Sequence, residues 1–215
     1  METRPTISVH LLVWGLVGVA LYLVGGLIES YPLRMAAKPL PMLALIAWTW
    51  LGAPSRTGRL VVGALCFGLL GDMLLELSSE TFLFGLVSFL AGHIVYIVAF
   101  SRSAPSLRLG LAIPWALFTG AIYLVLGSQL GAMAVPVVAY MGAISAMAWR
   151  ASAYAAERGG WALLAVLGAA LFLFSDTLIA VDRFGSPIEG VRPAIILTYW
   201  LGQAGLAASI RRDAS

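Results

Sequence analysis

Long apolar runs separated by short polar segments dominate the chain. Eight such runs occur, over roughly residues 8–28, 38–52, 58–77, 81–100, 109–126, 131–149, 160–181 and 192–210. A bilayer core of about 30 Å requires about 20 apolar residues in a helix. The runs are continuous, whereas strands of a membrane barrel alternate apolar and polar positions over about ten residues. The sequence therefore predicts an all-α membrane protein, with residues 1–215 forming a single bundle of eight transmembrane helices.

The first two predicted spans differ from the others. The second is short and begins with Pro39 and Pro41, which a helix tolerates at its start because the first amides have no intrahelical partners there. The first has an apolar region too long for a cleavable signal peptide, and no small-x-small cleavage site follows it directly. We therefore expect the first span to remain in the mature protein.

Composition supports a membrane location. The chain is 61% hydrophobic and 11% charged, whereas soluble domains carry about 25% charged residues. Its only cysteine, Cys66, excludes a disulfide framework and any multi-cysteine metal site. No lysine- or arginine-rich run could follow a nucleic-acid backbone. We expect an integral protein of the cell membrane, the inner membrane in a bacterium, surrounded by lipid and without a nucleic-acid partner.

The basic residues predict how the chain is oriented. Four lie on one side of the predicted bundle, namely Arg34, Lys38, Arg183 and Arg192. Nine lie on the side of the termini, namely Arg4, Arg56, Arg59, Arg102, Arg108, Arg150, Arg158, Arg211 and Arg212. Because basic residues concentrate on the cytoplasmic side, we predict that both termini are cytoplasmic.

A small set of polar side chains falls inside the predicted spans, where an ionised group is costly to insert. Asp72 and Asp176 each lie about five residues before the outer end of an outward-running span, which places each carboxyl group roughly 8 Å below the boundary. We expect the two carboxyl groups to face each other across a shared wet cavity near the outer rim. The full set is Lys38, Asp72, Glu76, His93, Asp176, Tyr199 and Gln203.

Two intramembrane carboxyl groups suit general acid–base hydrolysis. In a low-dielectric pocket one carboxyl group can keep its proton while the other stays ionised, so that one donates a proton and the other activates water. The sequence has no G-x-S-x-G elbow and no H-E-x-x-H pair. His93 together with the two aspartates could still bind zinc, so a metal-dependent lipid hydrolase remains an alternative.

A set of short motifs in a fixed order resembles the YhhN family of integral-membrane lysoplasmalogenases. Singly each motif is weak, but together they extend over nearly the whole chain. They are Lys38-Pro39, Gly71-Asp72-Met73-Leu74-Leu75, Phe84-Gly85-Leu86-Val87-Ser88-Phe89 with His93, Tyr96 and Phe100, Val138-Ala139-Tyr140, Phe174-Ser175-Asp176-Thr177-Leu178 with Phe184, and Tyr199 with Gln203.

The resemblance implies an enzyme that hydrolyses the vinyl ether bond of lysoplasmalogen to a fatty aldehyde and glycerophosphoethanolamine or glycerophosphocholine. It implies Asp72 and Asp176 as catalytic residues, without a cofactor or metal. The apolar residues 172–174 before Asp176 favour that aspartate as the acid. The predicted substrate-binding residues are Lys38, Glu76, His93, Tyr96, Ser175, Tyr199 and Gln203.

Two further classes stay open. A transporter or flippase of a small amphiphile would need polar groups in both halves of the membrane, whereas the inner half has little beyond His10 and His93. We find no internal repeat of the kind that many transporters contain. A non-catalytic membrane scaffold would not require carboxyl groups aligned in depth.

Overall fold

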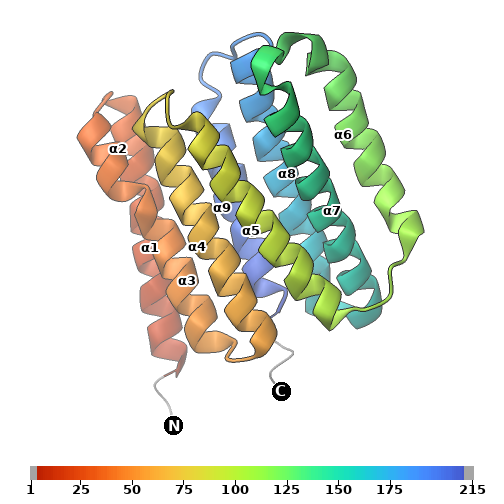
Figure 1. The fold of residues 1–215 in the computed structure, drawn as a ribbon. Helices are drawn as coiled ribbons and strands as arrows, with labels where there is room; N and C mark the ends of the chain where they lie inside the picture. The colour runs from red at the N-terminus through yellow and green to blue at the C-terminus, as the bar shows by residue number, and fades with distance from the viewer. Residues whose placement is uncertain (1–3, 211–215) are drawn as a thin grey trace.

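The computed structural model describes residues 4–210, with side chains from residue 8, as a bundle of helices without a β-strand in that range (Figure 1). Helices occupy all eight predicted ranges. They are α1 (Arg4–Leu27), α2 (Tyr31–Ala37), α3 (Pro39–Gly52), α4 (Arg56–Leu77), α5 (Phe82–Ser103), α6 (Ile113–Leu126), α7 (Ala134–Arg158), α8 (Leu163–Phe184) and α9 (Arg192–Ala208), with short 3-10 turns η1 (Leu109–Ala112), η2 (Gly127–Gln129), η3 (Gly131–Met133) and η4 (Gly160–Ala162).

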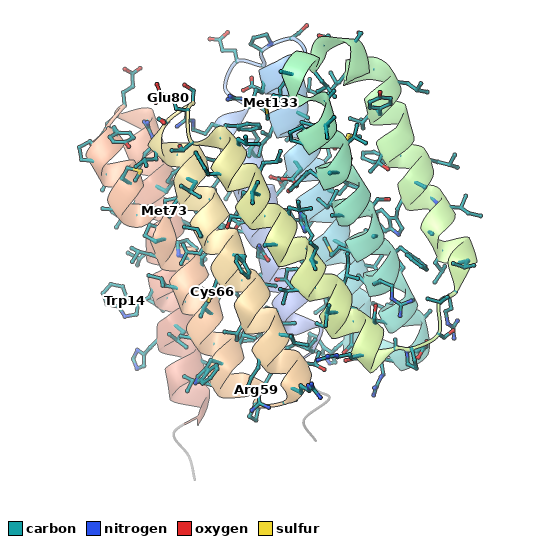
Figure 2. All side chains as sticks on the ribbon, in the orientation of Figure 1. Trp14, Arg59, Cys66, Met73, Glu80 and Met133 are labelled. Carbon is teal, nitrogen blue, oxygen red and sulfur yellow. The ribbon has the colours of Figure 1, made fainter. Side chains whose placement is uncertain are left out.

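Six segments of the described chain are long and apolar enough to cross a membrane. The first, Ser8–Leu27, lies within α1, and the other five contain α4 to α8. The helices α3 and α9 are shorter, with 14 and 17 residues. Apolar side chains such as Trp14 and Leu124, 62% and 85% exposed, project from the outside of the bundle, and Figure 2 shows Trp14 pointing away from α1. These outer faces are typical of contact with lipid hydrocarbon.

The short helix α2 was not predicted. Ser30 begins it in extended conformation and accepts a hydrogen bond from the Leu33 amide at 3.4 Å, and Pro32 lies in its first turn. Both features are helix-start signals, but Glu29, Ser30 and Arg34 make the segment polar enough to be interpreted as a loop. Lys38 is the single residue between α2 and α3. Its side chain therefore projects from the junction of these two helices.

Arg150 corrects one detail of the predicted topology. We expected it in a loop, but α7 continues to Arg158 and buries Arg150, which is 2% exposed. Its guanidinium donates to the carbonyl oxygens of Ala104 and Ser106 just after α5. Carbonyls at a helix C-terminus lack intrahelical partners, so Arg150 stabilises the end of α5 from within the neighbouring helix.

The two ends of the bundle differ. The start of α1 and the end of α9 lie at one end, with the α3–α4, α5–α6 and α7–α8 connections, and α2 lies at the opposite end (Figure 1). Arg34, Lys38, Arg183 and Arg192 belong to the α2 end, as predicted. Arg4, Arg211 and Arg212 fall outside the residues whose side chains are described. The cytoplasmic location of the termini stays a prediction.

Helices α8 and α9 pack closely through glycines. A Cβ atom at Gly168 would lie 2.6 Å from both the Gly202 carbonyl oxygen and the Leu206 amide nitrogen, and one at Gly202 would lie 2.9 Å from the Gly168 carbonyl oxygen. Small residues let helix backbones approach in membranes. This contact fixes the position of α8, which contributes Asp176, relative to α9, which contributes Tyr199.

We expect Gly168→Ala to destabilise the protein by about 1–3 kcal/mol, because the methyl group overpacks the α8–α9 contact and the backbones cannot separate freely. Gly26→Ala is the matched control, since a Cβ atom there meets nothing within 4 Å. Thermal unfolding in detergent measures both. Equal melting temperatures for the two variants would show that the glycine contact does not constrain the pair of helices.

Candidate active site

A polar cavity of about 240 Å³ lies between α1, α4, α5, α8 and α9 near the α2 end of the bundle. Asp72 and Asp176 both line it, so the structure places the two carboxyl groups at one shared cavity, as their depth in the sequence predicted. Its polar lining residues are Tyr22, Lys38, Asp72, Glu76, Ser175, Asp176, Asp182, Arg183, Arg192 and Tyr199.

Asp72 forms an ion pair inside the bundle. Its Oδ1 atom lies 3.0 Å from Lys38 Nζ, and both side chains are only 6% exposed. The neighbouring glycines make room for the site, because a Cβ atom at Gly71 would meet the Phe89 ring at 2.8 Å and one at Gly68 would meet Gln203 Nε2 at 2.5 Å. Asp72 Oδ2 is buried and has no hydrogen-bond partner within residues 8–210.

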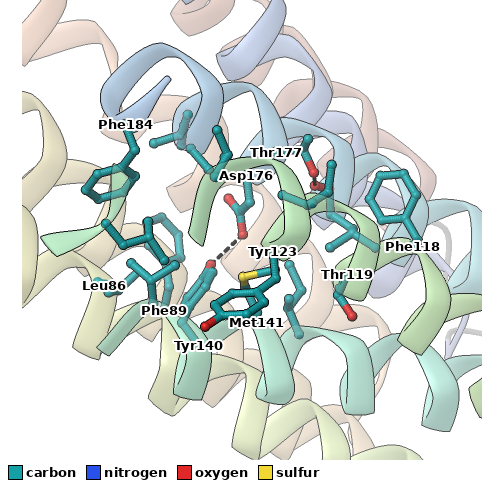
Figure 3. Close-up of a pocket in the computed structure, with 18 of the residues that line it drawn as sticks. Leu86, Phe89, Phe118, Thr119, Tyr123, Tyr140, Met141, Asp176, Thr177 and Phe184 are labelled. Atoms are coloured by element: carbon teal, nitrogen blue, oxygen red, sulfur yellow. Dashed lines mark hydrogen bonds between the residues drawn. The ribbon is translucent and has the colours of Figure 1, made fainter. Parts of the chain in front are cut away.

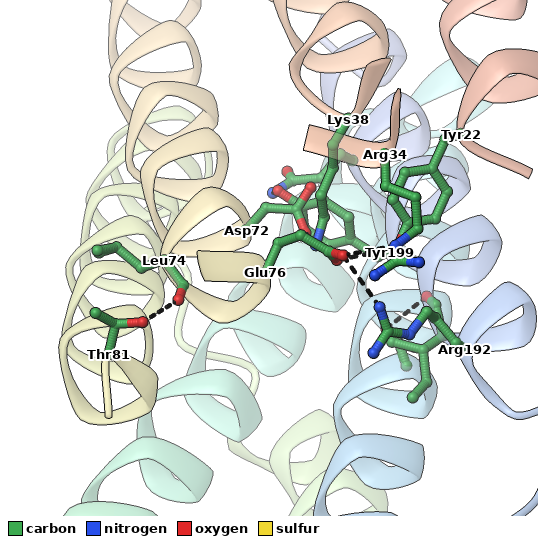
Figure 4. A network of polar contacts seen from close by, with 12 residues as sticks. Tyr22, Arg34, Lys38, Asp72, Leu74, Glu76, Thr81, Arg192 and Tyr199 are labelled. Atoms are coloured by element: carbon green, nitrogen blue, oxygen red, sulfur yellow. Dashed lines mark hydrogen bonds and ion pairs between the residues drawn. The ribbon is translucent and has the colours of Figure 1, made fainter. Parts of the chain in front are cut away.

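Glu76 connects four segments at the rim of the cavity (Figure 4). Its carboxylate lies 3.0 Å from Arg34 Nε, Lys38 Nζ and Arg192 Nη1. The Tyr22 hydroxyl also donates to it, at 3.1 Å. The Glu76 side chain is 5% exposed, so several cations compensate its negative charge. Glu76 was predicted to bind substrate. Both of its carboxylate oxygens already accept hydrogen bonds, so a substrate donor would have to share one of them.

Asp176 has a different environment. The Tyr140 hydroxyl of α7 donates to Asp176 Oδ2, as Figure 3 shows, and His93 Nε2 lies 2.9 Å from that hydroxyl. Because Tyr140 has one proton and donates it to Asp176, the His93 ring donates its Nε2–H to the Tyr140 oxygen. His93 Nδ1 is buried without a hydrogen-bond partner among the described residues. Asp176 forms no ion pair within that part of the chain.

Tyr140 is the missed residue that contacts a predicted catalytic carboxyl group. Sequence reasoning also missed four residues that line the polar cavity, namely Tyr22, Asp182, Arg183 and Arg192. Tyr140 belongs to the motif that contributed to the family resemblance, but we did not assign it to the site. One signal was present, since a tyrosine hydroxyl within a predicted span needs a polar partner. The rotation of α7 that directs this hydroxyl to Asp176 depends on packing between α5, α7 and α8, which the periodicity of α7 does not reveal.

Three predicted substrate-binding residues lie behind the cavity wall. His93, Tyr96 and Gln203 are at most 1% exposed and do not line the polar cavity. The Tyr96 hydroxyl donates to Gln203 Oε1 at 2.7 Å, and Gln203 Nε2 donates to the Tyr199 hydroxyl at 3.4 Å. His93 therefore holds the Tyr140 hydroxyl, and Tyr96 and Gln203 hold the Tyr199 hydroxyl, each by hydrogen bonds. Ser175, also predicted, lines the cavity and donates to the Ile195 carbonyl at 2.8 Å.

Three aromatic rings pack together at the inner end of the polar cavity, and two of them, Phe89 and Tyr199, line it. Phe89, Phe172 and Tyr199 pack edge to face, with centroid distances of 5.2 to 5.8 Å. The His93 ring lies 4.9 Å from the Phe172 ring on the far side. The cavity therefore has an aromatic floor below its two carboxyl groups.

An apolar cavity of about 70 Å³ adjoins the polar one (Figure 3). Asp176 lines both cavities, together with Leu75, Phe82, Phe89 and Ile179. The remaining walls come mainly from apolar side chains of α6, α7 and α8. The Asp176 carboxyl group thus lies at the boundary between a charged compartment and an apolar one, an arrangement that fits a molecule with a polar head and an apolar chain.

The described residues contain no group of three or more His, Cys, Asp and Glu side chains placed to hold a metal ion. His93, which the zinc alternative requires, bonds to Tyr140 and does not line the polar cavity. The positive charges at this cavity come from Lys38, Arg183 and Arg192.

Fold and site together define an integral membrane protein with an amphiphilic pocket built around two buried carboxyl groups. Residues 33–210 match the sequence profile described as the YhhN family. The match includes every residue of the candidate site except Tyr22. The chain belongs to the YhhN family.

Curated relatives carry the name lysoplasmalogenase. The chain is 33% identical over 178 residues to lysoplasmalogenase TMEM86B of Homo sapiens, with 82% of this chain and 74% of the relative covered. It is 31% identical over 201 residues to the Rattus norvegicus TMEM86B, covering 92% and 82%. It is 36% identical over 165 residues to lysoplasmalogenase TMEM86A of Homo sapiens, covering 74% and 67%. No solved structure matches the chain.

Proposed function

We propose that this protein is a lysoplasmalogenase that cleaves the vinyl ether bond by aspartate acid–base catalysis. The observation that carries the proposal is the position of Asp176, which lies where a charged cavity meets an apolar one and shares the charged cavity with Asp72. A lysoplasmalogen has its reactive bond at the same kind of boundary, between a phosphate-containing head and a hydrocarbon chain. Family membership and the names of the relatives support the same activity.

The first step is a proton transfer to carbon. Asp176 donates its proton to the vinyl carbon distant from the ether oxygen, and the carbon bonded to oxygen becomes an oxocarbenium ion. An apolar environment disfavours the charged form of a carboxyl group, and Asp176 has an apolar cavity on one side and no cationic partner among residues 8–210. Tyr140 donates to Oδ2, so the acidic proton is on Oδ1.

Asp72 is the matching base. Lys38 at 3.0 Å favours the ionised form of Asp72, and the Asp72 carboxylate, which lines the polar cavity, accepts a proton from water there. The water oxygen adds to the cationic carbon and gives a hemiacetal. As the hemiacetal collapses, its hydroxyl returns a proton to Asp176 and the leaving oxygen takes the proton held by Asp72. The products are a fatty aldehyde and the glycerophospho alcohol, and both carboxyl groups are restored.

The basic residues of the polar cavity fit the phosphodiester head. Arg183 and Arg192 line the cavity beside Asp182, and the Arg192 side chain is 59% exposed at the rim. Arginine presents several N–H donors in a geometry that matches phosphate oxygens. In our proposal these two residues hold the head while the vinyl ether reaches Asp176.

We place the chain in the cell membrane as a single transmembrane domain with both termini in the cytoplasm. The distribution of basic residues supports this orientation, because nine lie on the side of the termini and four on the other. The polar cavity, at the α2 end, would then open on the outer side of that membrane.

Purified protein incubated with three matched lysolipids tests the activity. We expect aldehyde from the vinyl ether and no cleavage of the saturated ether or the ester. Release of fatty acid from the ester would indicate a different hydrolase. Lysolipid counterflow in proteoliposomes without product would instead indicate the transporter, which the aromatic floor of the cavity disfavours.

A further inference from the structure

A third cavity opens on the outside of the bundle between α6 and α7. It is a groove of about 610 Å³ whose walls come from both helices and from the turn before α6. Its lining is mainly small or apolar, and it includes Ala116 and Gly120 on one wall and Gly142 and Ser145 on the other. Leu117, Leu124 and Val125 on the outward side of α6 are 66% to 85% exposed, which is typical of contact with lipid.

The groove adjoins the candidate active site. Thr119, Tyr123 and Met141 line both the groove and the apolar cavity that contains Asp176. Asp176 in turn lines the polar cavity. Three adjoining spaces therefore extend from the charged head region, past the Asp176 carboxyl group, to the lipid-facing surface between α6 and α7.

The small residues of the groove do not serve helix packing. Glycines at helix contacts let backbones approach, as Gly168 and Gly202 do between α8 and α9. At Gly120 and Gly142, by contrast, an added Cβ atom would meet nothing within 4 Å. Helix α6 lies at the outer edge of the bundle (Figure 1) and is the least buried of the six long apolar segments. The glycines on both walls therefore leave unfilled space between α6 and α7.

We propose that this groove binds the distal part of the substrate's hydrocarbon chain and is the path by which the chain reaches Asp176 from the lipid. The inference rests on the proposed function, because the occupant is the chain of a lysoplasmalogen. The apolar cavity of about 70 Å³ is far smaller than a long hydrocarbon chain requires. The chain must continue beyond it, and the groove is the apolar space that adjoins it.

Filling the groove tests the proposal. Gly142→Trp places a large side chain on the α7 wall, and Gly120→Trp does the same from the α6 wall, at positions where the backbone leaves room. Gly26→Trp is the matched control, because Gly26 is an open, exposed glycine on α1 away from the groove. Each variant is purified, checked for thermal stability, and assayed for aldehyde release with vinyl ether lysolipids of 4 to 18 carbons.

We expect the ratio of kcat/KM for the longest to the shortest substrate to fall at least tenfold in both groove variants and to stay at the wild-type value in Gly26→Trp. An unchanged ratio, or an equal loss on short and long chains, would overturn the groove assignment. Wild-type protein that releases no aldehyde from any substrate would instead contradict the proposed function, so the two failures are distinguishable.

Discussion

Asp176→Asn is expected to reduce aldehyde release from lysoplasmalogen by about 10²–10⁴-fold, the usual contribution of a general acid. Asparagine has nearly the same shape, and its carbonyl oxygen can still accept the hydrogen bond from Tyr140. It has no acidic proton to give to carbon. The fold should therefore survive while the first chemical step fails, and initial rates measured with purified protein in detergent will show the loss.

Two variants make this result specific. Glu157→Gln removes a carboxylate at the opposite end of the bundle, where it accepts a hydrogen bond from the Ser106 amide, and it should retain wild-type activity. Tyr140→Phe keeps the Asp176 carboxyl group but removes its donor, so we expect a loss of about tenfold or less, in line with one hydrogen bond. A folded Asp176→Asn protein with wild-type turnover would exclude Asp176 as the acid.

Asp72→Asn should cause a second loss of about 10²–10⁴-fold, because it removes the base that activates water and the negative charge that stabilises the oxocarbenium ion. Lys38 would still contact Glu76 at 3.0 Å, so its ammonium group would not be left without a carboxylate. We therefore expect the variant to remain folded.

The double variant Asp72→Asn/Asp176→Asn shows whether the two carboxyl groups act as one catalytic unit or contribute to the rate independently. Residues that act as one catalytic unit are strongly non-additive, so the double variant should be about as impaired as the worse single variant. Aldehyde release is again the measurement, with Glu157→Gln as the folded control. Fully multiplicative losses would contradict a shared acid–base pair.

Much of the helical architecture was predictable because lipid imposes a simple rule on the sequence. A spanning helix must be apolar over most of its length, so the apolar runs predicted every α-helix within residues 4–210 except α2. That helix has only seven residues and follows the polar pair Glu29 and Ser30. Its position depends on the ion pairs of Arg34 and Lys38 with Glu76 and Asp72. Such contacts join segments distant in the sequence, and periodicity does not report them.

The same rule identified the two aspartates as candidate site residues, because an ionisable side chain within an apolar run is costly to insert into a membrane. Depth in the membrane follows from the residue number within a span, and it correctly brought Asp72 and Asp176 to one cavity. Helix rotation does not follow from depth. For this reason His93, Tyr96 and Gln203 were expected at the cavity but lie behind its wall, while Tyr140 was not assigned and contacts Asp176.

The most direct test of vinyl ether protonation by the protein is the isotopic composition of the aldehyde formed in D₂O. Purified protein and lysoplasmalogen are incubated in D₂O, the aldehyde is reduced at once to the alcohol to prevent exchange, and its mass is measured. We expect one deuterium on the carbon next to the former carbonyl carbon in the wild-type product, and about 10²–10⁴-fold less product with Asp176→Asn. Aldehyde without deuterium at that carbon, or equal deuterated product from the folded Asp176→Asn variant, would contradict proton donation by Asp176.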